Sequence, residues 1–107
     1  IGERQFKVMR RSALLVNASR SAVVDERAMI KALKDGRIAG AGLDVFETEP
    51  LPDDSSLWHM ANVIITPHVA GASPHYWDRA TALFCDNLQR FLGDQPLVDE
   101  VNLEAGY

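Results

Sequence analysis

The sequence predicts an α/β protein that forms half of a doubly wound parallel sheet, with three parallel strands plus helices. Three short apolar runs, at 13–17, 38–46 and 62–66, are typical of strands. Their hydrophobicity is continuous rather than alternating, which favours parallel strands covered on both faces. A helical pattern separates the first two runs and a longer one follows the third, and strands that alternate with helices pair in parallel.

The first half of the chain predicts a helix, a strand and a second helix. Phe6 and Met9 stand three residues apart among charges, which indicates the last turns of an amphipathic helix over residues 2–10. The strand at 13–17 follows. Residues 25–34 carry one apolar stripe, begin with two acids and end just before Gly36, and these are helix start and stop signals.

The second half predicts two further strands and a long helix. Prolines end both strands, and a short turn over 57–60 separates them. The last pattern begins at Ser73, which is suited to a helix N-cap, and keeps apolar residues at helical spacing as far as Gly93. It predicts one helix over 73–93 of about five turns.

The composition is ordinary for one small globular domain, with 107 residues of which 47% are hydrophobic. A net charge of −4 gives no basic stripe for nucleic acid, so we expect a small-molecule ligand. No apolar run reaches the roughly 20 residues of a membrane helix, and no signal peptide is evident, so we expect a cytoplasmic protein. The single Cys85 cannot form an internal disulfide, and its apolar neighbours predict a buried thiol. The three histidines lack ligand spacing and predict no metal site.

Polar residues follow each predicted strand, and the carboxyl ends of parallel strands meet at one edge of a sheet. Arg20 follows the first strand, Asp44 and Glu49 end and follow the second, and His68 follows the third. An arginine fork suits a carboxylate substrate. A histidine with a carboxylate partner can exchange a proton near neutral pH. Each residue taken singly is more often a surface, capping or loop residue, so their combination carries the prediction.

Four segments place these residues in longer motifs. They are Leu-Leu-Val-Asn-Ala-Ser-Arg at 14–20, Val-Val-Asp-Glu at 23–26, Gly-Leu-Asp-Val-Phe-Glu-Thr-Glu-Pro-Leu at 42–51 and Ile-Ile-Thr-Pro-His-Val-Ala-Gly at 64–71. In order and spacing they closely resemble the D-isomer-specific 2-hydroxyacid dehydrogenases, a family that includes phosphoglycerate dehydrogenase and glyoxylate/hydroxypyruvate reductase. The resemblance covers nearly all of the chain.

The resemblance implies hydride transfer between a nicotinamide cofactor and a small 2-hydroxy or 2-oxo acid, on the C-terminal half of a doubly wound, Rossmann-type NAD-binding domain. It implies that Arg20 binds the substrate's carboxylate and carbonyl, that His68 is the acid and base, and that Glu49 stabilises the protonated His68.

The resemblance also implies which residues hold the cofactor, NAD or NADP with NAD favoured. Asp44 would bind the nicotinamide carboxamide, within a set made of Ala18, Ser19, Arg20, Asp44, His68, Val69, Ala70 and Gly71. The family pattern usually has glycine directly after the arginine, where this chain has Ser21, and we expect a local adjustment of that loop.

Full family members also carry a glycine-rich pyrophosphate loop and an acidic ribose-binding residue upstream, along with most of a separate substrate domain, and none of these is in this sequence. The chain begins without Met inside a helical pattern, so we expect the C-terminal portion of such an enzyme, inactive by itself. Residues 1–93 would be part of the NAD-binding domain, with helix 73–93 returning to the substrate domain. Residues 94–107 would be a tail that belongs to the substrate domain. We expect the parent to be a homodimer.

Two other interpretations stay open. Some relatives of this family act as nucleotide-sensing corepressors, so the scaffold could serve a non-enzymatic binding protein. The chain could also be a folded but inert remnant that dimerises or swaps segments to cover the unpaired edge of its first strand.

Overall fold

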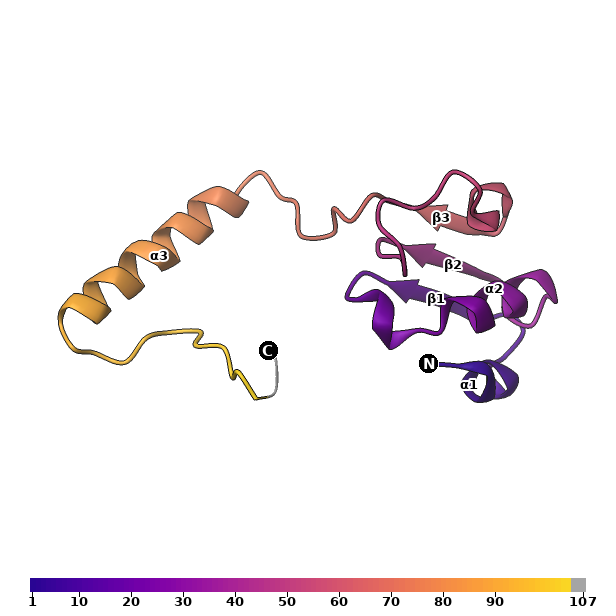
Figure 1. Cartoon of the computed structure of the whole chain (residues 1–107), viewed down its shortest axis with the longest axis horizontal. Coiled ribbons are helices and arrows are strands. Elements are labelled where there is room, and N and C mark those ends of the chain that lie inside the picture. Colours follow the sequence, from indigo (N-terminus) through magenta and orange to yellow (C-terminus); the bar gives the residue numbers. More distant parts are fainter. Residues whose placement is uncertain (105–107) are drawn as a thin grey trace. The chain divides into compact units, whose positions relative to one another are not determined.

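The computed structural model describes residues 1–104 of the chain. The chain divides into two units, Ile1–Ala70 and Gly71–Tyr107, which are described separately (Figure 1). The predicted division at residues 93 and 94 concerns the domains of a longer parent and stays a prediction. Residues 105–107, at the end of the predicted tail, lie outside the described residues.

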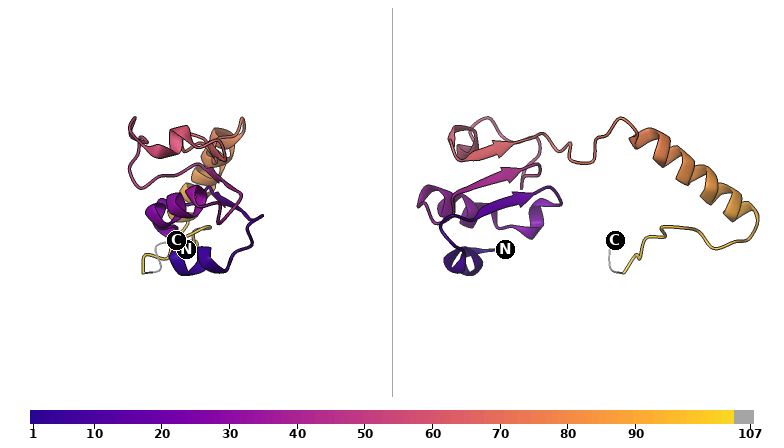
Figure 2. Two further views of the ribbon diagram at one scale, coloured as in Figure 1. Left: turned by 90° about the vertical axis from the view of Figure 1, so that its right-hand side faces the viewer. Right: turned by 180° about the vertical axis from the view of Figure 1, so that it is seen from behind.

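The first unit contains a three-stranded parallel sheet with the strand order β1-β2-β3, which confirms the predicted fold class (Figures 1 and 2). The strands are β1 (Leu14–Asn17), β2 (Gly40–Leu43) and β3 (Val63–Ile65). The helices of this unit are α1 (Glu3–Val8), α2 (Glu26–Lys34) and the 3-10 helices η1 (Ser21–Val23) and η2 (Ser56–His59).

Local chemistry accounts for the bounds of α2. The Asp25 carboxylate caps its first turn by accepting the Ala28 N–H at 2.9 Å. Gly36 follows the helix with φ +60°, a conformation that glycine adopts without steric cost. The strand β2 is shorter than the predicted 38–46: it starts at Gly40 and ends at Leu43, and the next residue, Asp44, binds the loop after β3 through its carboxylate. η1 was not predicted.

The sheet is covered on one face only, so the prediction that both faces of the strands are covered is wrong within this unit. Leu15 and Leu43 point to the covered face and are buried. On the other face Leu14, Val16 and Ile64 are 72%, 76% and 73% exposed. The unbroken apolar runs indicate that two faces are apolar, but whether a layer covers each face depends on elements outside the runs.

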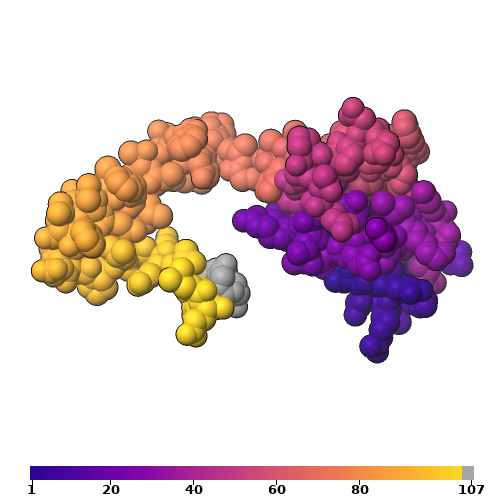
Figure 3. Space-filling model, in the orientation of Figure 1, coloured from indigo at the N-terminus to yellow at the C-terminus, as the bar shows by residue number. Residues whose placement is uncertain are grey.

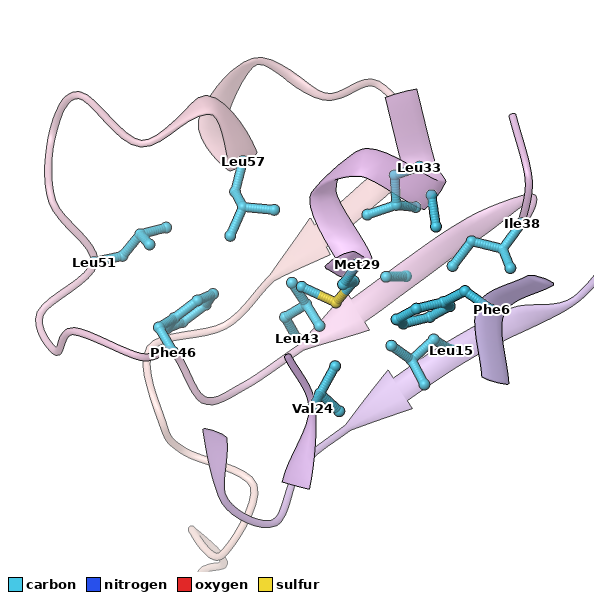
Figure 4. Close-up of a cluster of buried hydrophobic side chains, with 12 residues drawn as sticks. Phe6, Leu15, Val24, Met29, Leu33, Ile38, Leu43, Phe46, Leu51 and Leu57 are labelled. Carbon is cyan, nitrogen blue, oxygen red and sulfur yellow. The ribbon is translucent and has the colours of Figure 1, made fainter. Parts of the chain in front are cut away.

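The core lies between the covered face of the sheet and the helices of the first unit (Figure 4). Met29 and Leu33 from α2 and Phe6 from α1 pack on Leu15 and its neighbours. α1 also lies against α2, and the space-filling view shows its indigo atoms beneath the purple body of the unit (Figure 3). At the far end of the core, Leu57 of η2 packs with the loop that follows β2, and this fixes the shape of that loop.

The second unit contains one long helix, α3 (Tyr76–Leu92). It begins three residues after the predicted start at Ser73, because the Ser73 hydroxyl accepts the His75 N–H in a turn instead of capping the helix. Gly93 ends the helix as predicted. Cys85 is exposed, which contradicts the predicted burial, since α3 buries none of its side chains. Among the described residues, no helix has both the length and the apolar character that crossing a membrane requires.

Candidate active site

Glu49 and His68 form a pair just beyond the carboxyl end of the sheet. The Nδ1 atom of His68 lies 2.7 Å from the Oε2 atom of Glu49. The other carboxylate oxygen of Glu49 accepts the Phe46 N–H at 3.0 Å, which fixes the carboxylate in its loop. The side chains of His68 and Glu49 are 48% and 36% exposed, so a small molecule can reach the pair. With Nδ1 engaged by the carboxylate, Nε2 is the ring nitrogen left to exchange a proton.

Asp44 holds the turn that carries His68. His68 has φ +54°, a left-handed conformation that is uncommon for a residue with a side chain. The buried Asp44 carboxylate accepts the Thr66 hydroxyl at 2.5 Å and the N–H groups of Val69 and Ala70 at 2.9 and 2.7 Å. These bonds fix the chain on both sides of His68, so they stabilise its unusual backbone.

Asn17 holds the Arg20 loop by side-chain hydrogen bonds, as Asp44 holds the turn of His68. Asn17 is buried at the end of β1 and donates to the Arg20 carbonyl at 3.1 Å. Its Oδ1 atom accepts both the hydroxyl and the N–H of Ser19. Ser21 starts η1, and its φ is not positive. The backbone at this position is therefore not left-handed, and serine fits where the family usually has glycine.

The Arg20 side chain is exposed and its charge is not neutralised. Its Nη1 donates to the Ser19 carbonyl at 2.8 Å, and no carboxylate within residues 1–104 pairs with it. A planar guanidinium with its remaining donors free can bind a carboxylate from solution. The structure records no contact between Arg20 and the Glu49–His68 pair among the described residues.

A hollow of about 270 Å³ lies at the carboxyl end of the uncovered sheet face. It brings together half of the predicted cofactor-binding residues, and its wall is mostly apolar. The predicted residues that line it are Ala18, Asp44, Val69 and Ala70. The sheet supplies Val16, Gly42 and Ile64. Ser19, Arg20 and His68 lie outside its lining, and Gly71 belongs to the second unit.

Both carboxylates are held in their charged form. The Thr66 hydroxyl, and after it the Val69 N–H, lower the pKa of Asp44 although burial opposes this. The hydrogen bond to His68, and after it the Phe46 N–H, lower the pKa of Glu49. Glu49 therefore accepts from the histidine at neutral pH, as a partner that orients the ring must.

Sequence reasoning missed the supporting roles of Asn17 and Thr66. Both are polar residues that stand at the end of an apolar run, so the sequence held a signal for them. Their hydrogen-bond partners lie in loops, which the run itself does not identify.

Within residues 1–104, no group of three or more His, Cys, Asp or Glu side chains is arranged so that it could hold a metal ion.

Residues 1–70 match the model of the family described as D-isomer specific 2-hydroxyacid dehydrogenase, NAD binding domain. The chain therefore belongs to the D-isomer specific 2-hydroxyacid dehydrogenase family. The match covers the whole first unit, including the loops of Arg20 and Glu49 and the turn of His68.

Among curated relatives, the chain is 52% identical over 105 residues to a glyoxylate reductase of Korarchaeum cryptofilum. It is 49% identical over 88 residues to the glyoxylate/hydroxypyruvate reductase B of an Enterobacter species. These alignments cover 98% and 82% of the chain but only 32% and 27% of the relatives. The chain thus spans about a third of the length of these relatives.

Solved structures show the same similarity. A D-isomer specific 2-hydroxyacid dehydrogenase from Xanthobacter autotrophicus Py2, in complex with NADPH and MES, matches with a TM-score of 0.89 and 40% identity over 98% of this chain and 43% of that one. An NADPH-dependent glyoxylate/hydroxypyruvate reductase from Sinorhizobium meliloti, in complex with NADP and sulfate, matches with a TM-score of 0.90 and 33% identity over all of this chain and 35% of that one.

Proposed function

We propose that this chain supplies the acid-base residues of an NAD(P)-dependent oxidoreductase that interconverts a small 2-oxo acid and its D-2-hydroxy acid. The observation that carries the proposal is the 2.7 Å contact between Nδ1 of His68 and Oε2 of Glu49 at the carboxyl end of the sheet. The names of the relatives, glyoxylate and hydroxypyruvate reductases, support the same class of reaction.

His68 gives a proton to the substrate oxygen during reduction and takes it back during oxidation. Glu49 orients the ring through Nδ1, which leaves Nε2 to face the oxygen, and it stabilises the imidazolium that forms. Arg20 binds the substrate's carboxylate with its free donors and aligns the carbonyl, because two parallel hydrogen bonds fix the plane of a carboxylate.

The hollow on the uncovered sheet face suits a flat ring with one amide group. Its sheet wall is apolar, with Gly42 leaving room above β2. The Asp44 Oδ1 accepts two hydrogen bonds and Oδ2 only one, so Oδ2 keeps a lone pair for an amide N–H. A nicotinamide dinucleotide, when bound, supplies or accepts the hydride at C2 of the acid.

We also predict a preference for NAD over NADP, a homodimer, a cytoplasmic location and no activity of residues 1–107 alone. We predict further that helix 73–93 returns to a substrate domain and that residues 94–107 belong to that domain. Both cofactors should therefore be assayed side by side, and light scattering should give the oligomeric state.

The test uses the protein expressed from its complete reading frame, assayed for NADH and NADPH oxidation with glyoxylate and hydroxypyruvate. His68→Asn is the key variant, because asparagine tolerates the left-handed backbone at that position but cannot transfer the proton. We expect it to lower kcat by about 10²- to 10⁴-fold. Arg20→Lys should mainly raise KM for the acid, since lysine keeps the charge and loses the fork.

His75→Gln is the matched control. His75 is exposed, and its nearest carboxylate, Asp78, lies 3.8 Å away. It should leave kcat unchanged. Full activity in His68→Asn would refute the proposal. Tight binding of NADH without turnover of any 2-oxo acid by the wild type would favour the corepressor-like alternative instead.

A further inference from the structure

An apolar pocket adjoins the Glu49–His68 pair, and the function proposed above uses none of its other lining residues. It measures about 610 Å³, which is within the range of sites for small organic ligands. Six of its lining residues have no charge, and the other two are the pair itself. The lining comprises Phe46, Glu49, Pro50, Leu51, Trp58, Ile65, Pro67 and His68.

The inner wall of this pocket is rigid because it is continuous with the core. Phe46 and Leu51 are only 5% and 9% exposed, and both pack in the same cluster as the fully buried Leu57. Their side chains lie with that of Leu57 at one end of the core, and Phe6 lies at the other (Figure 4). A wall of this kind keeps its shape when a ligand enters.

The outer wall is the indole of Trp58. The ring is 49% exposed, although burial of so large an apolar side chain is favourable. Its Nε1 donates to the Pro52 carbonyl at 2.9 Å, so the indole is held in place and its only polar atom is already engaged. The ring therefore offers an apolar surface and no hydrogen bond to whatever occupies the pocket.

These walls favour one kind of occupant. The titratable side chains of the lining are Glu49 and His68, and the indole N–H of Trp58 is already engaged, so the ligand is polar where it meets the pair and apolar elsewhere. A 2-oxo acid with a hydrocarbon side chain has this distribution, since its carbonyl meets His68 and its side chain extends away. Glyoxylate has no side chain and would leave the pocket to water.

We propose that this pocket is the side-chain subsite of the active site, so that 2-oxo acids with a branched or aromatic apolar side chain are preferred over glyoxylate. The inference rests on the proposed function, because it needs His68 to be the residue that meets the carbonyl. Each methylene group that an apolar pocket accepts raises kcat/KM by about tenfold or more.

The first experiment needs no variant. With the protein from its complete reading frame and saturating cofactor, kcat/KM is measured for glyoxylate, pyruvate, 4-methyl-2-oxopentanoate and phenylpyruvate. We expect the last two to exceed pyruvate by at least about tenfold. A series that falls as the side chain grows would overturn the subsite, even if glyoxylate is reduced well.

The second experiment assigns the preference to this pocket. Trp58→Ala should lower the ratio of kcat/KM for phenylpyruvate to that for glyoxylate by about tenfold, and Trp58→Phe should restore most of it by returning an aromatic wall. Trp77→Ala is the control, because Trp77 is 77% exposed on α3 and does not line the pocket. It should leave the ratio unchanged.

The outcomes separate the two proposals. If His68→Asn abolishes turnover but Trp58→Ala leaves the ratio unchanged, the proposed function stands and the subsite is wrong. If no 2-oxo acid is turned over by the wild type, the proposed function and this inference fail together.

Discussion

Replacing Asn17 by alanine tests whether the buried amide at the end of β1 positions Arg20. The variant loses three hydrogen bonds. In one, the Asn17 amide donates to the Arg20 carbonyl, and in the other two, the Asn17 Oδ1 atom accepts the hydroxyl and the N–H of Ser19. The variant leaves the Arg20 side chain and its charge in place. Asn17 also lines the hollow of about 270 Å³, so a loss of affinity for the acid would reflect the position of the guanidinium only where the affinity for the cofactor is unchanged.

The expected size of the effect follows from these contacts. Two of the three bonds measure 3.1 Å and the third 3.3 Å. Each hydrogen bond contributes about 1 kcal/mol net. Ser19 and Arg20 are exposed, so water can replace part of what they lose, and we expect the free energy of unfolding to fall by about 2 kcal/mol. Loosening of the loop should also lower kcat/KM for the acid about tenfold.

The assay combines urea unfolding with initial rates, on the protein from its complete reading frame. Asn62→Ala is the matched control, because Asn62 is exposed and its side chain makes a single hydrogen bond of 3.4 Å, to the Ala39 carbonyl. It should change stability by less than about 0.5 kcal/mol. If Asn17→Ala matched this control in both stability and kcat/KM, the positioning role of Asn17 would be refuted.

Two further predictions concern packing and pH. Gly40→Ala should destabilise the protein by about 1–3 kcal/mol, because the new Cβ would lie 2.6 Å from the Asn62 carbonyl oxygen. Gly42→Ala meets only a Val16 methyl at 3.8 Å, so it should be neutral or stabilising, and equal unfolding midpoints for the two variants would contradict the register of β2. Glu49 has a lowered pKa, so its stabilising effect is present above its ordinary value of 4.5 and is lost as the pH falls through the lowered one. The stability difference between wild type and Glu49→Gln should therefore shrink as the pH falls below 4.5, and a difference that stays constant there would count against the contact with His68.

The parallel sheet could be predicted from the sequence because the signals for its strands and helices lie within or next to those elements. Apolar runs, proline stops and the Asp25 cap with Gly36 all act within a few residues of the element that they define. The start of α3 was predicted three residues early for the same reason, since Ser73 has two local options, a helix cap and a turn. The structure takes the turn.

The site was predicted in part, and the division follows the range of the interactions. Strand ends meet at one edge of a parallel sheet, so the meeting of Glu49 with His68 could be expected. The hydrogen bonds that Asp44 accepts from the turn at 66–70 join residues more than twenty positions apart in the sequence, and no local pattern predicts them. An apolar run also does not show whether another layer packs on each face of its strand. For this reason the exposure of Val16 and Ile64 contradicted the prediction that both faces are covered.

The fate of the hydride tests the proposed oxidoreductase function most directly. The protein from its complete reading frame would be incubated with glyoxylate and with NADH or NADPH in which both C4 hydrogens of the nicotinamide are deuterium, and the product would be analysed by mass spectrometry. We expect glycolate that carries deuterium at C2, formed by the wild type and almost absent with His68→Asn. Glycolate without deuterium, or labelled glycolate formed equally fast by both proteins, would contradict it.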